Sequence, residues 1–211
     1  LAALEKLQID AADDALFSAI SFPRLRELTL GGDVALHRFD EALARLPCLS
    51  SLEIEDSYEV HLVAPCAQAL SLQIIKIGTA GVGANDLWRL LRSSPHLREL
   101  AIHSDTDLTE EELNLLPPLR LQHLHTCYMF PELKSFTVIA LVEMWPALRS
   151  LDNYYQPKKE LAAEYERFFG DRTRAVPFEL WHPEAGLLFS IGPDGFASCE
   201  QVLEFEEEDE A

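Results

Sequence analysis

Four side chains that could bind a metal ion or take part in catalysis lie close together in the sequence. His123 and His125 are two residues apart and so share one face of an expected strand, while His103 and Cys127 directly follow neighbouring expected strands. Three tyrosines accompany them, Tyr128, Tyr154 and Tyr155. A structural zinc ion needs three or four ligands closing around it, whereas these residues show no ordered ligand spacing and lie on an open surface. We therefore expect a contact patch for a protein partner rather than a metal site or Cys–His catalysis, with simple surface exposure as the alternative.

Acidic side chains form a second candidate binding feature earlier in the chain. Glu27, Glu53, Glu55 and Asp56 fall at or beside outward-pointing positions of two consecutive strand-like segments, which would lie about 4.8 Å apart. Their fields would add and attract a basic peptide or domain. The alternative is that they are ordinary solvated carboxylates, because isolated surface charges contribute little. Further outward-pointing positions that we expect to contribute to binding are Lys76, Glu99 and Asp152.

Signatures of catalysis and cofactor binding are missing. The Gly-Val-Gly segment at 81–83 lacks both the GxGxxG pattern and the Lys-Ser/Thr of a phosphate loop, so we interpret it as a turn. No Ser-His-Asp set, pair of catalytic carboxylates or cofactor fingerprint is found, so we expect neither enzyme activity nor a cofactor. The four cysteines show no CxxC spacing, which favours free thiols in a reducing compartment.

Charge restricts the class of partner. The 211 residues include 36 acidic and 17 basic residues, a formal net charge of -19. Nucleic acids and anionic membranes both bind proteins through clustered Lys and Arg side chains, so we expect neither as a partner. No apolar run approaches the ~20 residues that span a bilayer, and no signal peptide opens the chain. We expect an intracellular protein, cytoplasmic or nuclear, that is monomeric by itself and preceded by further sequence, because Leu1 already lies within a repeat.

The elements that position these residues come from one repeated pattern, LxxLxL. It occurs seven times at intervals of 21 to 27 residues, beginning at Leu4, Leu25, Leu49, Leu72, Leu97, Leu121 and Leu148. Alternation at the LxL end predicts a short strand with leucines on one face and variable residues on the other. Between the strands, helical periodicity and prolines near the next strand predict a helix in each spacer, weakest at 57–69 and longest at 131–145. Stacking such units predicts a parallel sheet with helices outside it.

This pattern resembles the leucine-rich-repeat family over residues 1–155, particularly its ribonuclease-inhibitor-like and F-box-associated types. The resemblance implies an α/β solenoid of about seven repeats, with a curved parallel sheet, helices on the convex side and a ligand on the concave face. One departure is that the Asn or Cys usually found three residues after the strand is missing. That position holds Ala12, Asp33, Ser57, Ala80, Asp105, Met129 and Gln156.

The C-terminal part follows a different pattern. Residues 156–203 predict a helix at 157–169 and then an antiparallel meander with strands at 176–181, 187–191 and 196–205, joined by Pro- and Asp-Gly-containing turns. We interpret this unit as a cap on the last repeat, with a separate ligand-binding appendage as the alternative. The acidic tail, 204–211, should stay disordered.

These expectations favour a protein–protein interaction module. The resemblance suggests the substrate-recognition part of an F-box-type ubiquitin-ligase receptor. The alternatives are a repeat scaffold without an F-box, an inhibitor, or the sensor half of a receptor.

Overall fold

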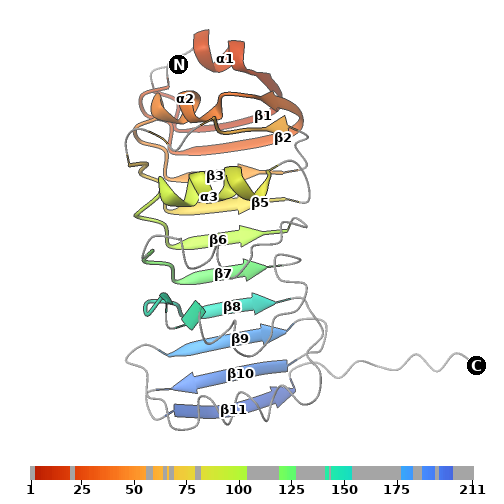
Figure 1. The fold of residues 1–211 in the computed structure, drawn as a ribbon, viewed down its shortest axis with the longest axis vertical. Helices are drawn as coiled ribbons and strands as arrows, with labels where there is room; N and C mark the ends of the chain where they lie inside the picture. Colours follow the sequence, from red (N-terminus) through yellow and green to blue (C-terminus); the bar gives the residue numbers. More distant parts are fainter. Residues whose placement is uncertain are drawn as a thin grey trace, which may run out of the picture.

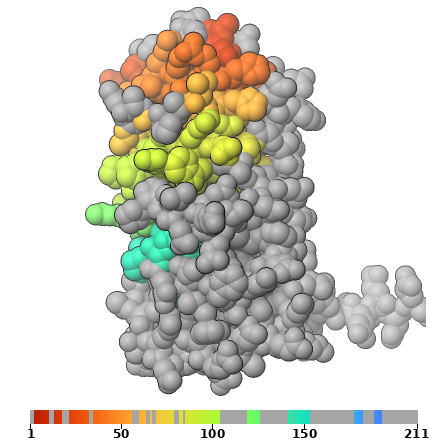
Figure 2. All heavy atoms as spheres, viewed as in Figure 1, coloured from red at the N-terminus to blue at the C-terminus, as the bar shows by residue number. Residues whose placement is uncertain are grey.

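The computed structural model describes residues 3–19, 22–55, 59–63, 66, 69–78, 82–103, 119–126, 141–142, 144–153, 177–182, 187–192 and 195–201. These residues form one open, mostly parallel sheet with few helices, an α/β arrangement (Figure 1). In the space-filling view, the coloured residues succeed one another along the long axis in sequence order (Figure 2). None of the described helices has the length and apolar character needed to cross a membrane.

The seven LxxLxL segments become neighbouring parallel strands. In order across the sheet these are β1 (Lys6–Asp13), β2 (Glu27–Leu36), β3 (Ser51–Ile54), β5 (Ile74–Ile77), β6 (Glu99–Ile102), β7 (His123–Thr126) and β8 (Ser150–Asn153). Equivalent positions of the pattern lie opposite one another at every pairing. The predicted parallel sheet is therefore confirmed.

The C-terminal strands continue this sheet and then reverse direction. Strand β9 (Phe178–His182) pairs parallel with β8, and β10 (Leu187–Gly192) and β11 (Gly195–Gln201) follow antiparallel. The predicted meander is confirmed, although its last strand is described only to Gln201. The predicted helix at 157–169 and the tail at 204–211 lie outside the described residues.

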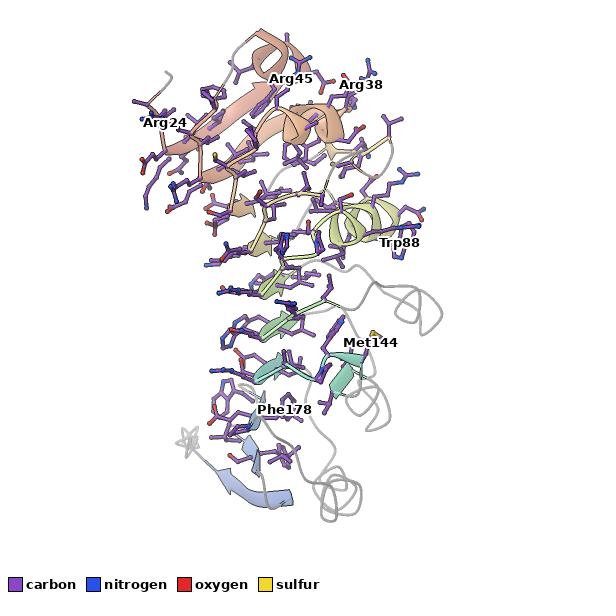
Figure 3. The ribbon with its side chains drawn as sticks, turned by 90° about the vertical axis from the view of Figure 1, so that its left-hand side faces the viewer. Arg24, Arg38, Arg45, Trp88, Met144 and Phe178 are labelled. Carbon is purple, nitrogen blue, oxygen red and sulfur yellow. The ribbon has the colours of Figure 1, made fainter. Side chains whose placement is uncertain are left out.

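Helices accompany several of the spacers. They are α1 (Asp14–Ala19), α2 (Phe39–Ala44) and α3 (Ala84–Arg92). Figure 3 shows α3, with the labelled Trp88 and Met144, to one side of the sheet, while many strand side chains project to the other. The weak spacer at 57–69 contains the short strand β4 (Glu59–Val60), paired with β2, and no helix in its described part. Most of the residues of the helices predicted between β6 and β7 and between β7 and β8 lie outside the described part of the chain.

One row of apolar side chains runs through the buried face of the sheet. Its members, one per strand, are Leu28, Leu52, Ile75, Leu100, Leu124, Leu151 and Leu180, each at most 1% exposed. Burying such a side chain stabilises a fold by about 1.5–3 kcal/mol. Because each strand covers the leucine of its neighbour, the core is continuous along the sheet.

Aspartates in the first turns of the helices hold the loops of adjacent units. The side chain of Asp14 accepts hydrogen bonds from the backbone N–H groups of residues 37–38, at 3.3 and 3.2 Å. Asp86 accepts a bond from Leu62 N–H at 3.1 Å, and Asp40 accepts one from Val63 N–H at 3.2 Å. Only the bond to Leu62 N–H is buried, and an unpaired N–H group is costly there, so Asp86 contributes more to stability than the two aspartates whose bonds are exposed.

Candidate functional site

The face of the sheet opposite the buried leucines, here called the open face, carries two rows of side chains. The first row is Lys6, Glu27, Ser51, Ile74, Glu99, His123, Ser150 and Glu179. The second is Gln8, Thr29, Glu53, Lys76, Ala101, His125, Asp152 and Trp181. Strand alternation produces both rows, since the residues between them are the buried ones. The outward positions proposed from the sequence, where described, lie in or directly beside these rows.

The acidic end of the open face lies over β1, β2 and β3. Lys6 Nζ is 2.7 Å from Glu27 Oε2, so the charge of Glu27 is compensated. Glu55 Oε2 and Asp10 Oδ1 both lean over Gly31, at 3.1 and 3.5 Å from the point where its Cβ would be. Asp10 was not predicted as part of the acidic group, and the absence of a side chain at Gly31 is the signal that could have indicated it. Asp56 lies outside the described residues.

Glu53, Glu55 and Asp10 concentrate negative charge at this end. Within the described part of the chain, no ion pair reaches any of these three carboxylates. Neighbouring strands are about 4.8 Å apart, so the potentials of the three groups reinforce one another. A cationic partner would gain more here than from a single exposed carboxylate.

Charges are paired in the middle of the open face. Lys76 Nζ on β5 lies 3.9 Å from Glu99 Oε1 on β6. Both side chains are partly exposed, so the pair contributes little to stability. It places the positive charge of Lys76 beside the negative charge of Glu99 on the open face. Between Lys76 and His125 the second row has only the methyl group of Ala101.

The two histidines of β7 each bind a residue of β8. His123 Nδ1 lies 2.8 Å from Ser150 Oγ, and His125 Nδ1 forms an ion pair with Asp152 Oδ2. The hydrogen bond to Asp152 raises the pKa of His125, helped by the charges of Asp152 and Glu99 and opposed by partial burial and by Lys76. Protonated His125 and Asp152 thus stabilise each other on the open face.

This arrangement does not form a catalytic triad or a metal centre. A triad needs one imidazole that contacts both the nucleophile and the carboxylate, whereas Ser150 and Asp152 meet different histidines. No group of three or more potential metal ligands occurs among the residues the structure describes. His103 continues the pairing of β6, its N–H bonding to Ile77 O at 2.8 Å. The rest of the predicted patch, Cys127, Tyr128, Tyr154 and Tyr155, lies outside the described residues.

Sequence reasoning missed two residues of the open face, Glu179 and Trp181. Both alternate with the buried residues Phe178 and Leu180, and the register places Glu179 opposite Ser150 and Trp181 opposite Asp152. Trp181 is partly exposed and Glu179 is exposed. The alternation in Phe-Glu-Leu-Trp is the available signal, which predicts the strand but not its parallel pairing with β8.

Among the described residues, one pocket of about 160 Å³ lies between α1 and α2, and another of the same volume lies beside the C-terminal end of α2. Pockets of this size are too small for most organic ligands.

The chain matches none of the protein families, curated proteins or solved structures with which it was compared.

Proposed function

We propose that this chain is a leucine-rich-repeat solenoid that binds a partner protein through the open face. The observation that supports this proposal is a contrast between the two faces of the aligned strands. One face repeats leucine or isoleucine, whereas the second row of the open face has eight different residue types. Stacking requires only the buried residues, so the variable ones are available for recognition. A broad sheet surface suits a macromolecule better than a small ligand.

The charge of the open face favours a basic partner. Glu53, Glu55 and Asp10 place three negative charges close together, within a chain whose formal net charge is -19. Such a surface speeds encounter with a positively charged protein and repels an acidic one. The proposed role is binding alone, with no catalytic step.

Matched charge variants test this function. Glu53→Gln with Glu55→Gln removes two charges from the open face, and Glu5→Gln with Glu41→Gln removes two exposed charges outside its two rows. We expect proteins captured from lysate by the wild type to be lost with the first variant and retained with the second. Equal capture by both variants contradicts the role of the acidic end.

The resemblance to F-box-associated repeats supports a specific role, substrate recognition in an F-box-type ubiquitin-ligase receptor. The test is the lifetime of a captured partner in cells. Depleting the protein should lengthen that lifetime, and should lengthen it no further when the proteasome is already inhibited. A lifetime that does not change on depletion contradicts this role and favours a scaffold or inhibitor.

A further inference from the structure

Strand β9 extends the open face beyond the seven repeats. Its pairing with β8 begins with the hydrogen bond from Glu179 N–H to Arg149 O, at 2.8 Å, and keeps the register of the preceding strands. Phe178 and Leu180 are buried with the core, so Glu179 and Trp181 point to the side that carries the two rows. The C-terminal meander therefore contributes side chains to the same surface that the repeats form.

Trp181 has the surroundings of a cation-binding aromatic residue. Asp152 lies directly opposite on β8, about 4.8 Å away along the sheet, and Glu179 lies two residues earlier on the same side of β9. The face of an indole ring attracts ammonium and guanidinium groups, and neighbouring carboxylates add to that attraction. Asp152 also pairs with His125, whereas no ion pair reaches Glu179 within the described part of the chain, so Glu179 supplies the larger share of that attraction.

We propose that Trp181, Asp152 and Glu179 receive a Lys or Arg side chain of the same basic partner that the acidic end of the open face attracts. This inference rests on the proposed function and specifies the partner. The occupant is an extended segment with two basic positions, one over Glu53 and Glu55 and one over Trp181.

The geometry of the sheet sets the spacing of the two basic positions. Glu53 and Trp181 belong to the same row and are five strand intervals apart, which is about 24 Å. An extended chain covers that distance in roughly seven residues. Lys76 lies between the two ends, beside Glu53 in the same row, so the middle of the segment should be neutral or acidic.

Synthetic peptides test the spacing. The bipartite peptide carries an Arg pair at each end of a seven-residue Ser/Glu spacer, and the control peptide has the same composition with all four Arg residues adjacent. Fluorescence anisotropy measures the binding of each labelled peptide to the full chain. We expect the bipartite peptide to bind about two- to fivefold more tightly, since a cation–π contact at an exposed site contributes about 0.5–1 kcal/mol.

Substitutions at Trp181 separate recognition from folding. Trp181→Leu keeps an apolar side chain but removes the aromatic face, so the advantage of the bipartite peptide should disappear, whereas Trp181→Phe should retain part of it. Equal binding of the two peptides to the wild type, or an advantage that survives Trp181→Leu, overturns the inference. In those cases, a loss of all peptide binding with Glu53→Gln and Glu55→Gln still supports the proposed function, whereas binding of neither peptide to the wild type contradicts both.

Discussion

The two faces of the sheet are built from alternate residues of the same strands, yet they follow different rules. On β7, Leu124 is fully buried, while His123 and His125 beside it are partly exposed and bind Ser150 and Asp152. The buried row repeats leucine or isoleucine from strand to strand, and the neighbouring row of the open face changes at every step. Stacking therefore constrains the residue type on one face of each strand and leaves the residue type on the other face unconstrained.

The strongest test of this difference compares two adjacent residues. Leu124→Ala should lower the free energy of unfolding by about 2–5 kcal/mol, because it removes buried apolar surface and leaves a cavity. His125→Ala, on the open face, should lower it by less than about 1 kcal/mol. Denaturant unfolding measures both values. Similar losses for the two variants would show that the faces are not energetically distinct.

Removing a buried polar side chain should lower the free energy of unfolding less than removing a buried leucine, but more than breaking an ion pair on the open face. Asp86, 8% exposed, accepts a bond from Leu62 N–H and contacts His61 and Arg89. Asp86→Ala leaves these groups without their acceptor, so we expect a loss of about 1–3 kcal/mol in unfolding free energy. Asp86→Asn keeps a carbonyl oxygen and should lose less. If the two variants are equally stable in urea unfolding, the hydrogen bond to Leu62 does not contribute.

The regular alternation of the two faces is interrupted between β1 and β2, where the register shifts beside Asp10. Gly32 adopts φ 61° there, and a Cβ would lie 2.4 Å from Asp10 O. Left-handed backbone costs other residues about 1–2 kcal/mol, so Gly32→Ala should destabilise the protein by at least that amount. The control is Gly83→Ala, because φ at Gly83 is -68° and the nearest atom to its Cβ position is 3.8 Å away. Thermal unfolding should separate the two variants, and equal melting temperatures would contradict strain at Gly32.

The smallest expected effect is a pH dependence of the pair on the open face. Because the folded-state pKa of His125 is raised above its ordinary value of 6.5, the stability from its pairing with Asp152 is fully present below about pH 6.5. It is lost as the pH rises through the folded-state pKa. Both groups are partly exposed, so we expect a loss of a few tenths of a kcal/mol. Unfolding free energies at pH 6 and pH 9 measure it, and His125→Gln should lack this component. An unchanged pH dependence in that variant argues against the pair.

The sequence was sufficient to predict the parallel sheet, its strand order and the core leucines. Leu52, Ile75 and Leu100 occupy the same place in successive LxxLxL segments, and strands with the same period and direction align these places. The meander was also predicted, because its alternation and turns are local signals.

Contacts between units were harder to predict. The hydrogen bonds that Asp14, Asp40 and Asp86 accept join a helix to a loop more than 20 residues away, so they depend on the position of the helix and not on a local motif. The place of Trp181 was missed for a related reason. The repeat stops before β9, so its register with β8 follows from the fold rather than from the period.

The same aspartates have a consequence for how the molecule opens. Each one accepts the hydrogen of at least one amide that belongs to another unit, so a movement that separates the two units also frees that amide to exchange its hydrogen with solvent. The amides of residues 37–38 and 62–63 are therefore built-in probes of local separation. Their relative exchange rates would reveal which pair of neighbouring units separates first, before the whole sheet unfolds.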